Sequence, residues 1–199
     1  MIRITGHFLI LLISANANAQ PKFISSGKIV FERKLDLHKE MYNRPWVWFN
    51  ADRSKTPRYY TTTHHLFFTK QETLFKRDPA DIEKSAYYNG DRSADDIVYT
   101  NLEKDIFIKK QAFFEENVFL SDSLRNLKWE MTNEVRNIAG FDCHKATTII
   151  LDSVYIIAFY CDEILSGGGP LSFHNLPGAI LGLVIPRMNI TYFATGIEL

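Results

Sequence analysis

The sequence predicts a mostly β protein with a single antiparallel domain. Apolar residues recur at every second position, and β-branched and aromatic residues gather between turn signals. Strand patterns also follow one another without the alternating helices that a parallel sheet requires. These three observations favour one sheet of many strands, connected mainly by short turns.

The same pattern places the individual elements in order along the chain. Strands are expected at residues 28–34, 59–69, 73–76, 97–101, 105–114, 117–120 and 128–132, and the clearest hairpin joins 141–150 to 154–161. One short helix is expected at 78–84, because Asp78 can cap a helix and Pro79 suits its first position. No repeat or linker divides the chain.

The N-terminus has the composition of a secretory signal. Arg3 precedes the short apolar run 8–13, and small residues alternate in 15–19. We expect cleavage after Ala19, so that residues 1–19 are the signal peptide and residues 20–199 form the mature domain. The apolar run is shorter than the roughly 20 residues that span a bilayer, and no later run reaches that length. The expected location is the periplasm or another part of the cell envelope.

The balance of charged residues bears on which partners the protein is expected to bind. The chain has 23 basic and 23 acidic side chains, and removal of the signal takes away only Arg3 among them. This balance gives no electrostatic reason to expect binding of nucleic acid or of anionic lipid surfaces. Hydrophobic residues make up 46% of the chain, which is typical of a folded domain with its own core.

Two blocks of the C-terminal third are similar to the signature of the GLPGLI family, a group of exported envelope proteins of Gram-negative bacteria. The matching residues are Trp129, Glu134, Ile138, Gly140, Cys143, Lys145, Ala146, Gly169, Pro170, Phe173, Leu176, Pro177, Gly178, Ile180 and Leu181. Asn175 and Ala179 depart from the name-giving hexapeptide. The resemblance implies an envelope location and a strongly curved sheet, similar to the open half-barrels of envelope lipoprotein carriers. It implies no particular reaction.

The two cysteines are expected to form a disulfide. Exported proteins with few, evenly numbered cysteines usually oxidise them. If the hairpin turns about Asp152, Cys143 faces Cys161 across an antiparallel pair, close enough to bridge. A slip of one residue would face Cys143 with Asp162 and leave both thiols unpaired.

The sequence suggests no metal, cofactor or catalytic motif. His64 and His65 are adjacent on a strand and leave opposite faces, so they cannot chelate one ion together. The glycine run before Pro170 lacks the Lys-Ser or Lys-Thr and the helix start of a phosphate loop. Asp162 and Glu163 are interpreted as strand-end carboxylates. We therefore expect no enzyme activity.

The best functional candidate is the apolar segment 171–185, interrupted by Pro177 and Gly178. Burial of one large apolar side chain contributes about 1.5–3 kcal/mol, so the segment is expected to pack as a covering loop over the sheet. The ligand- or partner-binding candidates are Phe173, Leu176, Pro177, Gly178, Ile180 and Leu181.

Three functions remain open at this point. The first is a non-catalytic binding or accessory protein that works with an outer-membrane or periplasmic partner. The second is a carrier that holds a lipid-like or other apolar ligand in a concave sheet. The third is an enzyme whose site the sequence does not reveal. A deep apolar cavity would favour the carrier, and an exposed apolar patch over a packed interior would favour the accessory protein.

Overall fold

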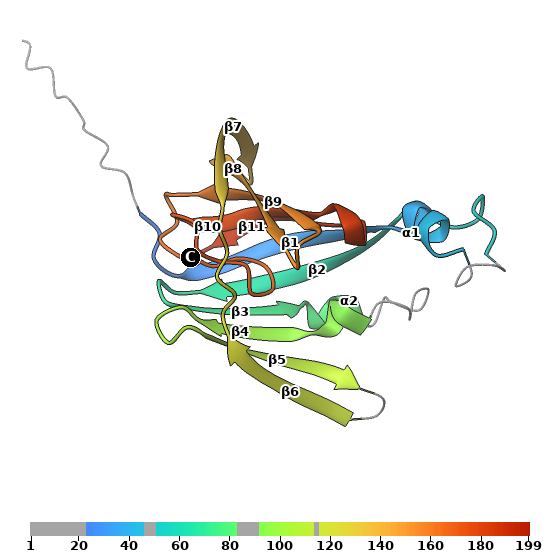
Figure 1. Cartoon of the computed structure of the whole chain (residues 1–199), viewed down its shortest axis with the longest axis horizontal. Helices are drawn as coiled ribbons and strands as arrows, with labels where there is room; N and C mark the ends of the chain where they lie inside the picture. Colours follow the sequence, from blue (N-terminus) through green and yellow to red (C-terminus); the bar gives the residue numbers. More distant parts are fainter. Residues whose placement is uncertain (1–22, 46–50, 83–91, 114–115) are drawn as a thin grey trace, which may run out of the picture.

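The fold is one open antiparallel sheet of eleven strands (Figure 1). This confirms the mostly β, antiparallel fold class that the sequence predicts. The computed structural model describes residues 23–45, 51–82, 92–113 and 116–199. The strands are β1 (Gly27–Asp36), β2 (Tyr59–Phe68), β3 (Glu72–Arg77), β4 (Ile97–Asn101), β5 (Ile106–Phe113), β6 (Glu116–Ser123), β7 (Glu130–Ile138), β8 (Phe141–Ile150), β9 (Val154–Cys161), β10 (Ala179–Ile185) and β11 (Ile190–Glu198). The predicted signal peptide lies outside the described residues.

The strand order is β6-β5-β4-β3-β2-β1-β11-β10-β9-β8-β7. Two antiparallel meanders, β1 to β6 and β7 to β11, therefore meet where β1 pairs with β11. The chain leaves the first meander at one edge of the sheet and enters the second at the opposite edge. We call residues 124–129, which make this passage, the crossing segment.

The crossing segment requires the sheet to curve. Eleven flat strands at roughly 4.8 Å spacing would separate the two edges by roughly 48 Å. The chain from Ser123 to Glu130 can reach only about 25 Å when fully extended. The sheet must therefore bend until its edges approach one another, and Figure 1 shows the segment rising from β6 across the sheet to β7.

Two α-helices border the sheet. α2 (Pro79–Ile82) is the predicted helix, and the Asp78 carboxylate accepts a hydrogen bond of 2.9 Å from the Ala80 N–H. α1 (Leu37–Asn43) is a helix that the sequence reading missed. Its N-cap is Asp36, whose side chain accepts from the Lys39 N–H at 3.1 Å. Two short 3-10 turns, η1 (Arg92–Asp95) and η2 (Pro186–Met188), complete the elements.

The expectation that residues 171–185 form one covering loop was wrong in its second half. Residues 179–185 are strand β10, which pairs with both β9 and β11. β10 is covered on both faces, so its apolar run shows no alternation from which a strand could be recognised. β11 was likewise not assigned from the sequence. Only residues 171–178 remain as a loop over the sheet.

The register shows which side chains share the concave face. From β5 to β2, Phe107 pairs with Thr100, Thr100 with Thr73, and Thr73 with Phe68. From β1 to β9, Arg33 pairs with Tyr192, Tyr192 with Leu183, and Leu183 with Ala158. Paired residues point to the same side of a sheet, and alternate residues of one strand do too. Both series are therefore on one face, because β2 joins them through β1.

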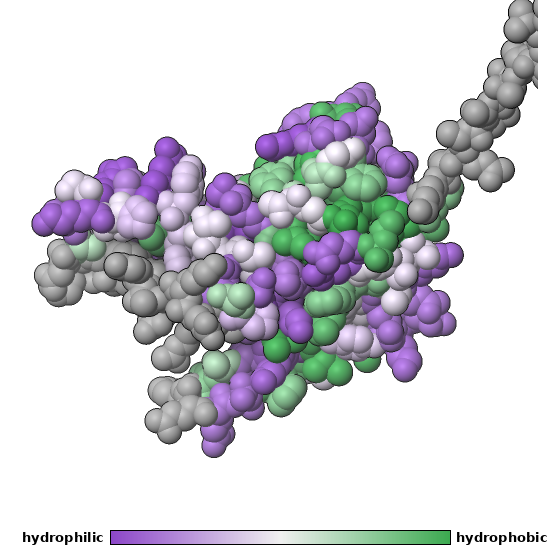
Figure 2. Space-filling view, turned by 180° about the vertical axis from the view of Figure 1, so that it is seen from behind, coloured by the Kyte–Doolittle hydropathy of each residue, from purple (hydrophilic) through white to green (hydrophobic). Residues whose placement is uncertain are grey.

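Figure 2, seen from behind, shows that the end of the molecule carrying α1 is mostly hydrophilic, whereas hydrophobic side chains gather on the other half. The buried core is continuous. Fully buried apolar residues such as Ile29, Phe31, Leu66, Ile156 and Leu183 belong to one continuous cluster.

Candidate ligand-binding site

The concave face has a polar half, built on β1, β2, β3 and β11. Arg33 is fully buried, and its Nε donates to the Tyr192 hydroxyl at 3.2 Å. Arg77 binds the Asp95 carboxylate at 2.8 Å and donates to the Tyr60 hydroxyl at 3.2 Å. Both arginines are buried and bond to neighbouring tyrosines or to Asp95, so this half is filled by polar side chains.

His64 lies in the centre of the polar half. Its ring stacks on Phe75 with centroids 5.2 Å apart, and its Nε2 lies 2.9 Å from the Ala94 carbonyl oxygen. Burial, together with the nearby positive charges of Arg33 and Arg77, lowers the pKa of His64 to about 4. The imidazole is therefore neutral at pH 7 and serves as a packed, hydrogen-bonded core group.

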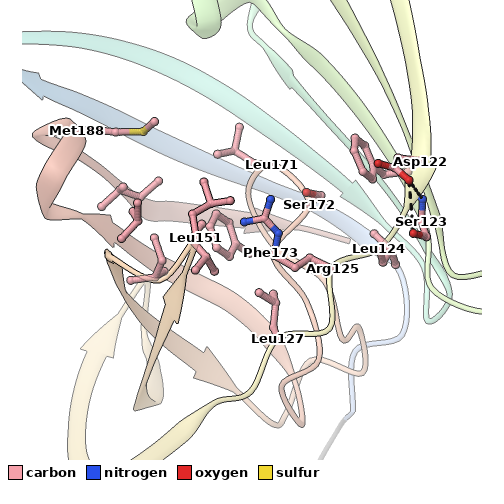
Figure 3. A pocket seen from close by; sticks show the side chains of 15 residues that line it. Asp122, Ser123, Leu124, Arg125, Leu127, Leu151, Leu171, Ser172, Phe173 and Met188 are labelled. Atoms are coloured by element: carbon pink, nitrogen blue, oxygen red, sulfur yellow. Dashed lines mark hydrogen bonds between the residues drawn. The ribbon is translucent and has the colours of Figure 1, made fainter.

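The other half of the concave face holds a pocket of about 480 Å³ (Figure 3). Its volume lies within the range typical of small-molecule sites. Eleven of its fifteen lining residues are apolar: Phe107, Leu124, Leu127, Ile150, Leu151, Val154, Ile156, Leu171, Phe173, Ile185 and Met188. The remaining four are Asp122, Ser123, Arg125 and Ser172.

The pocket is framed by segments that are far apart in the sequence. The crossing segment supplies Leu124 and Leu127, the loop before β10 supplies Leu171 and Phe173, and β9 supplies Ile156. Ile156 is fully buried, whereas Phe173 is half-buried. The pocket therefore has an apolar floor on the sheet and a wall of loop residues.

Hydrogen bonds fix the crossing segment to the loop. The Trp129 indole N–H donates to the His174 carbonyl at 2.8 Å, and the Asn175 side-chain amide donates to the Leu127 carbonyl at 3.0 Å. The Thr148 hydroxyl donates to the Lys128 carbonyl at 2.7 Å. These bonds hold the C-terminal part of the segment in place, so the pocket wall is preformed.

The two blocks that resemble the GLPGLI signature meet at this wall. Trp129, from the first block, contacts the ring of Phe173, from the second, at 6.5 Å between centroids. Asn175, which replaces a glycine of the hexapeptide, has φ of 70°. Asparagine tolerates this left-handed conformation better than most residues, and its side chain also bonds to Leu127.

The six candidate site residues separate into different environments. Phe173 lines the pocket, whereas Leu176, Ile180 and Leu181 are buried in the core. Pro177 is exposed. Most of the segment 171–185 therefore packs in the core, and only its start and its last residue, Ile185, reach the pocket.

Gly178 is required because of close packing, and not because its turn needs the conformational freedom of glycine. Its φ is not in the left-handed region that favours glycine. A Cβ placed there would lie 1.9 Å from the Cys161 carbonyl oxygen. Close approach of the backbone to β9, and not conformational freedom, therefore explains the glycine.

The sequence reading missed the pocket residues of the crossing segment. Leu124 and Leu127 lie between the strands expected at 117–120 and 128–132, in a stretch to which no element was assigned. Both are buried. Two leucines three residues apart in a stretch without strand alternation were the available signal.

The two cysteines stand in the predicted register. β8 and β9 pair from His144↔Tyr160 to Ile150↔Val154, which places Cys143 and Cys161 at the next opposed position. Both are fully buried and are free thiols in the structure, so the expected bridge is not seen there. Burial raises the pKa of Cys143 to about 12 and also raises that of Cys161.

The histidines are separated as predicted. His64 faces the core, whereas His65 on the opposite face lies 3.5 Å from the Asp78 carboxylate. Within the described ranges, no group of three or more His, Cys, Asp or Glu side chains is arranged to hold a metal ion. No helix in these same ranges is long and apolar enough to cross a membrane.

Comparison with known proteins gives a likeness of fold alone. No protein-family model matches the chain, and no curated protein matches it significantly. Two structures of PNGF-II, in space groups C2 and P21, resemble it with TM-scores of 0.58 and 0.59 at 15% and 14% identity. The matches cover 87% of this chain but only 27% and 28% of PNGF-II. The chain thus spans little more than a quarter of the length of PNGF-II.

Proposed function

We propose that the protein is a non-catalytic binding protein of the cell envelope that carries a small apolar ligand in the pocket under the crossing segment. The observation that supports this proposal is the pocket itself, with eleven apolar side chains around about 480 Å³. Polar groups suited to chemistry lie elsewhere on the concave face. His64 is neutral and buried, and Arg33 and Arg77 are engaged with tyrosines and Asp95.

A titration with N-phenylnaphthylamine, an uncharged fluorophore that brightens in apolar sites, tests the proposal. The natural chain should bind it saturably. Ser172→Trp adds a large side chain at the pocket wall without removing a core residue, and should abolish the signal. Ser25→Trp, at an exposed position outside the pocket, is the matched control and should bind normally. Equal binding by both variants, or none by the natural chain, would reject the carrier.

Export and envelope location form part of the same proposal. Support comes from the basic start, apolar run and Ala-Asn-Ala pattern of residues 1–19, and from the resemblance to the GLPGLI family. The mature chain should begin at Gln20. Intact-mass measurement of exported protein would show this, and a retained Met1 would contradict it.

The Cys143–Cys161 disulfide also remains a proposal, since opposed positions and an oxidising compartment favour it. Mass spectrometry of protein taken from the periplasm should show the loss of two hydrogens relative to the reduced chain. Two alkylatable thiols after unfolding would exclude the bridge.

A second candidate function, docking of an envelope protein, is favoured by the β5–β6 hairpin. β6 stands at the edge of the sheet, and Phe119 and Leu120 on it are 67% and 45% exposed. An edge strand with exposed apolar side chains can accept a strand from a partner. Phe119→Ser should abolish capture of a periplasmic or outer-membrane partner while leaving fluorophore binding intact. Unchanged capture would remove this candidate.

A further inference from the structure

We infer that the ligand is a single-chain amphiphile with an anionic headgroup, and that Arg125 selects the headgroup. This inference rests on the proposed function and names the class of molecule that the pocket takes. Arg125 is the one cationic side chain among the fifteen residues that line the pocket. In Figure 3 its guanidinium extends from the crossing segment toward the middle of the pocket.

The bonding of Arg125 distinguishes it from the arginines of the polar half. Arg77 binds Asp95 and Tyr60, and Arg33 bonds to Tyr192. Within the described residues, Arg125 makes no hydrogen bond or ion pair with another side chain. Its five N–H donors are therefore available to a ligand, and their planar arrangement matches the oxygens of a carboxylate or a phosphate.

The acidic residue of the pocket, Asp122, is not bonded to Arg125. The Asp122 carboxylate accepts from the backbone N–H of Ser123 at 2.8 Å and from its hydroxyl at 3.4 Å. Asp122 lies near the end of β6, and its second carboxylate oxygen accepts no hydrogen bond within the described residues. The pocket thus has a carboxylate at one end and, in its middle, a cation without a bonded partner among the described residues.

The placement of Arg125 also fits an amphiphile better than a wholly apolar ligand. Arg125 is exposed, whereas Ile156 and Ile185 on the floor of the pocket are buried. An alkyl chain would lie on the floor and gain from loss of apolar surface, while the headgroup remained at the solvent-facing guanidinium. An uncharged ligand would gain the same apolar burial but would leave the guanidinium bonded only to water.

Displacement of N-phenylnaphthylamine by three ligands of equal chain length tests this inference. Decanoic acid and decyl phosphate carry the anionic headgroup, and decanol does not. The two anions should displace the fluorophore from the natural chain at a concentration about tenfold lower than decanol, since a hydrogen bond to a charged group is worth this much or more. Whichever of the two anions displaces the fluorophore at the lower concentration carries the preferred headgroup, carboxylate or phosphate.

Arg125→Gln should remove the preference for the anions and leave displacement by decanol unchanged. Arg53→Gln, at an exposed position outside the pocket, is the matched control and should keep the preference. Equal displacement by all three ligands in the natural chain, or a preference that persists in Arg125→Gln, would overturn the headgroup inference while the carrier function stands. Failure of the natural chain to bind the fluorophore or any of the ligands would overturn both.

Discussion

The two halves of the concave face are both built from strands whose side chains alternate between the two faces. They differ in the side chains that point inward. Over β1 to β3, the inward positions carry Arg33, His64 and Arg77, which bond to the Tyr192 hydroxyl, to the Ala94 carbonyl and to the Tyr60 hydroxyl, respectively. Over β8 to β10, the inward positions carry aliphatic residues such as Ile156 and Ile185, and a pocket remains above them.

This difference teaches that inward polar residues are not by themselves a sign of function. In the polar half of the concave face, Arg33, Arg77 and His64 bond to tyrosines, Asp95 and a backbone carbonyl, but some buried polar atoms, such as His64 Nδ1 and Thr62 Oγ1, have no hydrogen-bond partner among the described residues. The apolar half is preformed by bonds from Trp129 and Asn175 to backbone carbonyls, and it retains both space and a free cation, Arg125. Binding should therefore depend on the apolar half, and acid stability on the polar half.

The largest effect is expected from Gly178→Ala, which tests whether the apolar half needs close backbone packing. The added Cβ would meet the Cys161 carbonyl oxygen at 1.9 Å, so β9 and β10 must separate. The free energy of unfolding should fall by about 3 kcal/mol or more, measured by urea denaturation. Gly196→Ala, whose Cβ would have no heavy atom within 4 Å, is the control. Equal stability of the two variants would refute the packing explanation.

The second prediction concerns acid stability and the polar half. The folded pKa of His64 is about 4, below its ordinary value of 6.5, so the unfolded chain binds more protons between these pH values. Stability should therefore fall as pH drops from 6.5 toward 4, with His64 contributing up to about 3 kcal/mol. His64→Gln should flatten this part of the pH profile of the urea midpoint. An identical profile in the variant would show that His64 does not govern it.

The third prediction concerns Phe173→Ala, which tests whether the side chain at the rim of the pocket contributes to stability and to ligand binding. Phe173 is half-buried against Trp129 and lines the pocket, so its removal should cost about 2 kcal/mol of stability, less than the loss of a fully buried ring. Fluorophore binding should weaken in the folded variant. Complete unfolding at room temperature would assign Phe173 to the core, and unaltered binding would remove it from the site.

The smallest effect is expected from Asn175→Asp, which probes how the pocket wall is held. Aspartate also tolerates the left-handed conformation, but it cannot donate to the Leu127 carbonyl. Stability should decrease by about 1 kcal/mol, and hydrogen exchange at Asn126 and Leu127 should accelerate. Unchanged exchange at these two residues would mean that the crossing segment is held by other contacts.

Alternation allowed much of the sheet to be predicted from the sequence. β4, β8 and β9 have the predicted boundaries, and the register of the β8–β9 hairpin follows from its turn. β10 was missed because a strand covered on both faces shows no period.

The pocket could not be predicted because it depends on contacts between distant residues. Nothing local in Leu124 or Leu127 shows that the crossing segment lies over Phe173, since their proximity arises from the curvature of the whole sheet. Phe173 was identified among the candidates, but the adjacent Leu176 and Ile180 belong to the core. The sequence therefore indicated a segment that contributes Phe173 to the pocket, without separating this residue from the neighbouring core residues.

The central claim is that ligand occupies the apolar half of the concave face and not the polar half. Methyl NMR of the natural chain during titration with decanoic acid tests it most directly. The methyl signals of Leu124, Leu127, Ile156 and Ile185 should shift together and saturate, whereas those of Ile29 and Leu66, on β1 and β2 of the other half, should remain in place. Shifts confined to Ile29 and Leu66, or no shift in the pocket methyls at saturating ligand, would contradict the account.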